Sequence, residues 1–143
     1  MSRKTDRRHV FNLMFQMQFY PQMSPEELFE RYFSCRTFEA EDLELGDKAD
    51  MEYVMTTLAG ITEHSQHINR KIAEFSRNFL PERLMKTDLV ILRLAVYELL
   101  YSPSVPPKVA INEAVELSKI YSGDESPAFV NGLLGQLART HKI

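Results

Sequence analysis

The segment Thr87–Tyr101, "TDLVILRLAVYELLY", constrains the fold most strongly, because it is apolar on almost every side. A helix with apolar residues all round is stable only when other elements surround it. After Asp88 its only charged residues are Arg93 and Glu98, and buried charges are tolerated only when they are paired. We therefore predict a central buried helix here, in which Arg93 and Glu98 have structural partners rather than catalytic roles.

The other long segments repeat their apolar residues at helical spacing, and no run alternates with period two for long enough to make a strand. The chain of 143 residues has the length of one domain. The predicted fold class is therefore all-α, a single domain over 1–143 with about seven helices. The acidic, poorly periodic stretch 35–47 is predicted to be a connecting loop. The helices are expected at about 5–19, 25–33, 48–62, 65–75, 87–101, from 107 to near 122, and from 126 onward.

Several short signals predict where helices begin and end. Ser24 and Glu27, around Pro25, form a capping box in which each side chain satisfies a backbone N–H of the first turn. Thr87 can cap the central helix, and Ser126 with the proline after it repeats the serine-cap signature. Gly123 offers a left-handed C-terminal cap.

Two glycines interrupt the last predicted helix. Glycine is a poor helix former, and the spacing of Gly132 and Gly135 places both on one face. We expect this face to let another helix approach closely.

The usual catalytic and cofactor motifs are missing, so the sequence predicts neither an enzyme nor a cofactor. The only cysteine, Cys35, cannot form an internal disulfide, and an idle thiol is favoured over a nucleophile. His64 and His67 lie one helical turn apart, but no third or fourth metal ligand accompanies them. No stretch is apolar for long enough to cross a bilayer, and the start does not resemble a signal peptide. We expect a cytoplasmic protein without a membrane partner.

The charge of the chain is distributed unevenly, although its formal net value is only -3. Arg3, Lys4, Arg7 and Arg8 cluster at an exposed helix start, where guanidinium groups and the helix N-terminus both favour phosphate. This indicates nucleic-acid binding, but four basic residues are a weak signal by themselves. Phe129 could stack on an unpaired base, although a core position is the commoner arrangement for phenylalanine.

The C-terminal third carries a long and specific run of motifs. "ILRLAVYELL", a proline turn, "VAINEAVELSK" and "ESPAFVNGLL" follow one another between 87 and 134, and the basic start precedes "NLMFQ". In this order and spacing the chain resembles the NusB family of bacterial transcription antitermination factors. The resemblance extends over nearly the whole chain, with the middle only loosely constrained.

The resemblance implies an all-helical fold of two small helical subdomains, about 1–80 and 81–143. It also implies a protein that pairs with the small-subunit ribosomal protein NusE. The pair would bind boxA in nascent ribosomal RNA, as single-stranded RNA, and would join the antitermination complex on RNA polymerase. Members of the family include both monomers and homodimers, so the resemblance also admits a homodimer.

Carried over residue by residue, the resemblance implies RNA contacts at the basic start and at the acidic-serine turn of the last helix. Asp88 stands where the family directs an acidic residue toward NusE. Two positions depart from the family pattern: Arg8 stands where an acidic residue is common, and Gly135 where many relatives have aspartate. The residues expected to contact RNA are Arg3, Lys4, Arg7, Arg8, Glu125, Ser126 and Phe129.

A polar pair, Asn112 and Glu113, interrupts an otherwise apolar helix pattern. We expect this pair, and Asn131 on the last helix, to bond to backbone groups and so support the RNA-binding face. Direct RNA contact is the less favoured alternative. A second class of function also stays open, a helical protein–protein adaptor in which the basic start is incidental.

Overall fold

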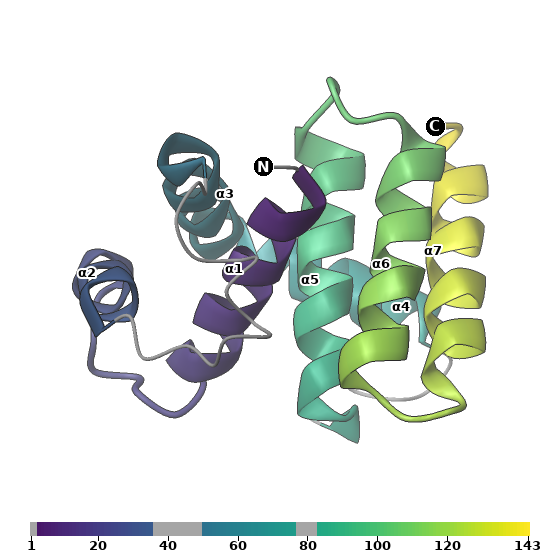
Figure 1. Cartoon of the computed structure of the whole chain (residues 1–143). Helices are drawn as coiled ribbons and strands as arrows, with labels where there is room; N and C mark the ends of the chain where they lie inside the picture. Colours follow the sequence, from purple (N-terminus) through teal and green to yellow (C-terminus); the bar gives the residue numbers. More distant parts are fainter. Residues whose placement is uncertain (1–2, 36–49, 77–82) are drawn as a thin grey trace. The chain divides into compact units, whose positions relative to one another are not determined.

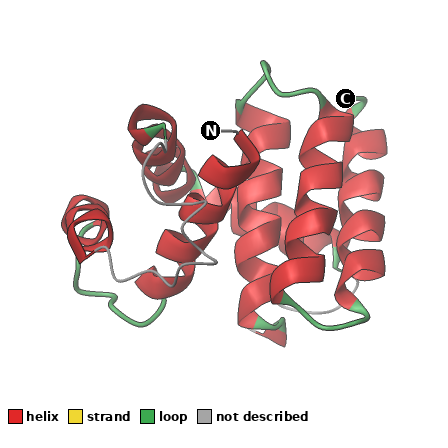
Figure 2. Ribbon diagram, viewed as in Figure 1, coloured by secondary structure: helices red, strands yellow, loops and turns green. Residues whose placement is uncertain are grey.

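The computed structural model describes residues 3–35, 50–76 and 83–143, and within them it contains seven helices and no strand (Figure 2). The predicted all-α class is confirmed. Most of the stretch predicted to be an acidic loop lies outside these described ranges, and so does the side chain of Cys35. The helices are α1 Arg3–Met17, α2 Pro25–Cys35, α3 Met51–Glu63, α4 Ser65–Phe75, α5 Lys86–Tyr101, α6 Pro107–Tyr121 and α7 Ser126–His141.

The chain divides into two compact units, Met1–Thr62 and Glu63–Ile143. The family resemblance implies a division near residue 80, after α4. The structure assigns α4 to the second unit, because α4 packs on both α5 and α7. The observed division therefore falls before α4 rather than after it.

The first unit is organised around the packing of α1 on α2. His9 is fully buried, and its Nδ1 lies 2.9 Å from the Tyr32 hydroxyl. The Phe33 ring lies 5.1 Å from the His9 ring between centroids. The histidine thus fills apolar space while its polar atom keeps a partner, which is the arrangement that a buried polar group requires.

The capping box predicted at the start of α2 is present. The Glu27 backbone N–H donates to the Ser24 Oγ, and the Ser24 backbone N–H donates to Glu27 Oε1, each at 3.1 Å. The two side chains therefore satisfy backbone donors reciprocally, and they set the start of α2.

The second unit packs around α5, which contacts α4, α6 and α7. Figure 1 shows α5, α6 and α7 side by side. Residues 88–92, 94–96, 98 and 99 of α5 are buried, so its predicted central position is confirmed within this unit. Arg93 Nε donates to Asn69 Oδ1 on α4 at 3.0 Å, and the buried Glu98 also has an interaction partner. Neither charge is left alone, as the sequence predicts.

The two histidines weighed as metal ligands instead contact one tyrosine. The His64 ring stacks on Tyr101 with 3.9 Å between centroids, and His67 Nδ1 hydrogen-bonds the Tyr101 hydroxyl. This cluster joins the start of α4 to the end of α5. Within the described ranges, no helix is long and apolar enough to span a bilayer.

Three predicted helix caps are wrong. The N-cap of α5 is Met85, and Thr87 Oγ1 accepts a hydrogen bond from Ser122 at 2.9 Å instead of capping. Ser126 is the first residue of α7 and bonds elsewhere. After α6, Ser122 adopts an extended conformation, and the Gly123 backbone is not left-handed. In each case a tertiary partner or an extended cap residue replaces the local motif.

Candidate nucleic-acid interface

The four basic residues of α1 differ in exposure. Arg3 and Lys4 are exposed and Arg8 is half-buried, but Arg7 is only 4% exposed. The expectation that all four lie on an exposed start is therefore wrong for Arg7. This residue lies three positions before Val10, on the helical stripe that the core buries. In this conformation Arg7 offers little surface to a phosphate.

Arg3 is exposed, but two carboxylates hold its guanidinium. Its Nη1 lies 3.2 Å from Asp6 Oδ2 and 3.3 Å from Asp50 Oδ2, and its Cζ lies 4.0 Å from the centroid of the Tyr53 ring. Asp6 is buried, and its Oδ1 also accepts the Asp50 backbone N–H at 2.9 Å. The start of α1 is thus tied to the start of α3.

Asp50 is the residue in this cluster whose protonation is shifted. The backbone N–H of Tyr53 donates to Asp50 Oδ1 at 3.0 Å, and this bond, followed by the attraction of Arg3, lowers the pKa of Asp50 below its usual value. Asp50 therefore stays ionised at neutral pH beside Arg3. It caps α3 and competes with any phosphate for the guanidinium.

The sequence did not predict this neutralising cluster. A local signal was present, because Asp6 lies three residues after Arg3 on the same helix, where opposite charges meet. The contribution of Asp50 was not readable locally, since it is separated from Arg3 by 47 positions.

In the second unit, two residues with different expected roles bond to each other. The Ser126 hydroxyl donates to Asp88 Oδ2 at 3.0 Å, and both residues are buried, at 4% and 6% exposed. Asp88 Oδ1 is also buried, and it has no hydrogen-bond partner within the described residues. The charge of Asp88, expected at the surface facing NusE, is therefore turned inward in this structure. The pair joins the start of α5 to the start of α7.

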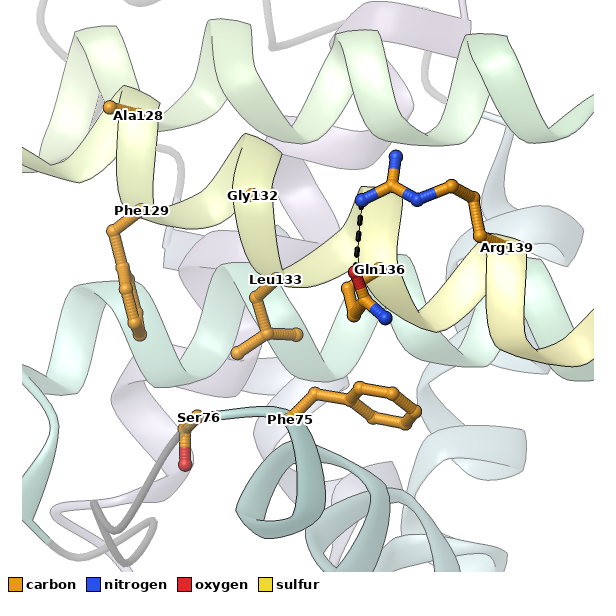
Figure 3. A pocket seen from close by; sticks show the side chains of 8 residues that line it. All are labelled: Phe75, Ser76, Ala128, Phe129, Gly132, Leu133, Gln136 and Arg139. Carbon is orange, nitrogen blue, oxygen red and sulfur yellow. Dashed lines mark hydrogen bonds between the residues drawn. The ribbon is translucent and has the colours of Figure 1, made fainter.

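Phe129 lies one turn further along α7 and is half-buried. It lines a groove of about 460 Å³ between the end of α4 and one side of α7 (Figure 3). Glu125, just before α7, is exposed. Phe129 is thus neither a fully buried core residue nor a freely projecting one. The groove is lined by Phe75, Ser76, Ala128, Phe129, Gly132, Leu133, Gln136 and Arg139.

The predicted structural supports are not arranged as expected. Asn112 and Asn131 are exposed, and neither side chain forms a hydrogen bond within the described part of the chain. Glu113 is half-buried and does have an interaction partner. The expectation of backbone bonds is therefore wrong for the two asparagines, because both project from the outward sides of α6 and α7.

Comparison with known proteins identifies the family of this chain. The NusB family model matches residues 4–139. The chain belongs to the NusB family. The NusB transcription antitermination protein of Acetivibrio thermocellus is 36% identical over 97% of this chain and 90% of its own length. That of Clostridium tetani is 47% identical over 65% of this chain, and the match spans 61% of the C. tetani protein.

Solved NusB structures share the fold. A structure of T. maritima NusB matches with a TM-score of 0.83 and 32% identity, covering 97% of this chain and 92% of that chain. A structure of antitermination factors NusB and NusE in complex with dsRNA matches with a TM-score of 0.79, covering 96% of each chain. At 24% identity, this second likeness supports the fold alone.

Proposed function

We propose that this NusB-family chain is a non-enzymatic RNA-binding transcription antitermination factor that pairs with NusE on boxA RNA. The observation that carries the proposal is the match to curated antitermination proteins over nearly the whole chain. The NusB of a similar solved complex assembles with NusE and dsRNA. By analogy, this chain would act within the antitermination complex on RNA polymerase, and a homodimer of it would cover the RNA-binding face.

The basic start supports a phosphate-binding role. Lys4 is exposed at the beginning of α1, where free backbone N–H groups and the helix dipole attract anions. Arg3 lies beside it but is held by Asp6 and Asp50. We propose that RNA phosphate displaces the exposed Asp50 contact, while the buried Asp6 keeps the guanidinium in place. Arg8 adds a half-exposed cation on the same helix.

In the second unit, Glu125 and Phe129 supply the accessible part of the proposed RNA face. We propose that Asp88 and Ser126 act indirectly, because their mutual bond sets the entry of α7 and thereby the position of Phe129. Contact of Asp88 with NusE would then require the start of α7 to open.

The alternative function is a helical adaptor that binds protein without direct RNA contact. The neutralised guanidinium of Arg3 and the buried side chain of Arg7 favour this alternative, since they leave fewer cations for phosphate.

Titration of a fluorescent boxA oligonucleotide with NusE alone, this chain alone and the mixture distinguishes the two functions. The proposal predicts that RNA binds the mixture more tightly than NusE alone. It also predicts that replacing Arg3 and Lys4 together with alanine removes most of the gain while NusE binding persists. An adaptor would bind NusE equally well but add no RNA affinity in either form.

A further inference from the structure

The groove beside α7 is open above Gly132, although no neighbouring element needs a glycine there in order to pack. Gly132 lies in the interior of α7, where glycine destabilises a helix relative to alanine. A Cβ atom at this position would meet no atom within 4 Å, so no neighbouring element needs the missing side chain. The sequence predicts a close helix approach at Gly132, and the structure shows open space there instead. The glycine therefore keeps the groove accessible down to the backbone.

The walls of this groove are aromatic and aliphatic. Phe129 and Phe75 lie toward opposite ends, with Leu133 between them (Figure 3). Phe129 is half-buried in the groove wall, and it stacks on no other ring in the part of the chain that the structure describes. A flat apolar ligand suits such walls, and unpaired nucleobases in RNA are commonly bound by stacking on phenylalanine.

The polar side of the groove presents hydrogen-bond donors. Arg139 Nη2 donates to Gln136 Oε1 at 3.0 Å. An arginine side chain has no acceptor, so this bond requires the amide oxygen of Gln136 to face Arg139. The amide nitrogen of Gln136 remains as a donor, together with the other N–H groups of Arg139. A ligand edge that carries acceptors matches this surface.

The charge of the lining also favours RNA. Arg139 is the only ionised residue among the eight that line the groove, and it is exposed. No carboxylate stands among these eight described lining residues to repel a phosphate backbone. The volume of about 460 Å³ lies within the range of small-ligand sites, roughly 300 to 1,000 Å³.

We infer that the groove between Phe75 and Phe129 binds one unpaired RNA base, with Gln136 and Arg139 selecting an acceptor-rich edge. Guanine presents two adjacent acceptors, O6 and N7, whereas adenine pairs its N7 acceptor with an amino donor. The groove therefore prefers guanine to adenine. This inference rests on the proposed RNA binding, and it adds Phe75, Gly132, Gln136 and Arg139 to the residues implicated in it.

The experiment uses the full chain and uridine decamers that carry one guanine, one adenine or one abasic site at the centre. Fluorescence anisotropy measures the affinity for each decamer. Loss of one stacked base weakens binding by about 1 to 3 kcal/mol, so the guanine decamer is expected to bind about 5- to 150-fold more tightly than the abasic one. The guanine decamer is expected to exceed the adenine decamer by about 2- to 10-fold, the range of a single net hydrogen bond.

Two variants test the groove itself. Gly132→Gln fills the opening, and it is expected to abolish the difference between guanine and abasic decamers while the melting temperature stays unchanged or rises. Thr140→Gln, exposed on α7 outside the groove, is the matched control. Gln136→Leu removes the donor and is expected to lose the preference for guanine over adenine but keep the preference over the abasic decamer. Gln66→Leu, exposed on α4, is its control.

The outcomes separate this inference from the proposed function. If all decamers bind in a salt-dependent manner but the abasic one binds as well as the others, RNA binding stands and the base site is wrong. The same holds if Gly132→Gln keeps full discrimination, or if it weakens NusE binding instead. If no RNA binds with or without NusE, the proposed function fails, and the inference fails with it.

Discussion

The bond between Ser126 and Asp88 allows a sharp test of how α7 is positioned. Replacing Ser126 with alanine removes the donor to a carboxylate that is only 6% exposed. The other carboxylate oxygen, Oδ1, already lacks a partner among the described residues. Ser126→Ala thus leaves a buried carboxylate without its hydroxyl donor, whereas Asp88→Ala removes the carboxylate and leaves only a hydroxyl.

The expected magnitude follows from this asymmetry. A hydrogen bond to a charged group contributes about 1.5 to 3 kcal/mol, and stranding a buried polar group adds to the loss. We expect Ser126→Ala to reduce the free energy of unfolding by about 2 to 3 kcal/mol. Asp88→Ala should cost about 1 to 2 kcal/mol, since a hydroxyl is less expensive to leave unpaired than a carboxylate. The double variant should resemble Asp88→Ala, so the coupling energy should equal the cost of Ser126→Ala alone, about 2 to 3 kcal/mol.

Urea denaturation followed by circular dichroism measures these free energies for the four proteins of the cycle. Ser104→Ala, at an exposed position in the turn before α6, is the matched control and should be within about 0.5 kcal/mol of the unmodified chain. If the losses of unfolding free energy from the two single substitutions add up in the double variant, the reasoning is refuted. An Asp88→Ala variant of unchanged stability that loses only NusE binding would refute it as well.

Three further predictions concern charge, pH and the Phe129 ring. Asp50→Asn keeps an oxygen that can cap α3 but removes the charge that holds Arg3. RNA affinity at low salt should therefore rise by up to about fivefold. An unchanged or lower affinity in an anisotropy titration would contradict the displacement of Asp50 by phosphate. Burial, and then the charges of Glu63 and Glu98, raise the pKa of Tyr97 above its usual value. As pH rises, the Tyr97 hydroxyl therefore loses its proton in the unfolded chain before it does so in the folded chain. The melting temperature should fall more steeply above about pH 10 in the unmodified chain than in Tyr97→Phe. Parallel plots of melting temperature against pH for the two proteins would contradict this prediction. Phe129→Ala should weaken RNA binding by about 1 to 3 kcal/mol with little change in melting temperature, whereas a large drop in melting temperature would identify the ring as core.

Helices and their apolar faces were predictable from the sequence because they depend on residues three or four positions apart. The bounds of α4 match the predicted range, and the Ser24 capping box is present as expected. Both rest on local chemistry. Thr87 and Ser126 fit local capping rules equally well, yet their hydroxyls bond to residues 35 and 38 positions away. A hydroxyl with a tertiary partner does not need to serve its own helix end.

The candidate site was predictable in type but only partly in geometry. The family motifs led to Phe129 and the basic start, but composition could not reveal that Arg7 faces the core or that Asp50 holds Arg3. The groove residues Gln136 and Arg139 are ordinary polar residues of a helix end. The one sequence signal for the groove was Gly132. A glycine inside a helix indicates either close packing of another element or an open surface, and only the structure distinguishes the two.

The central claim is that the exposed cations of α1 bind RNA phosphate, and the salt dependence of RNA affinity tests it most directly. For the complex of this chain with NusE, the logarithm of the association constant for single-stranded boxA RNA should fall linearly with the logarithm of salt concentration. Lys4→Ala should reduce the slope by about 0.7, the value for one phosphate contact on a single strand. Lys119→Ala removes another exposed lysine, from α6, and should leave the slope unchanged. Equal slopes and affinities for Lys4→Ala and the unmodified chain would contradict the claim.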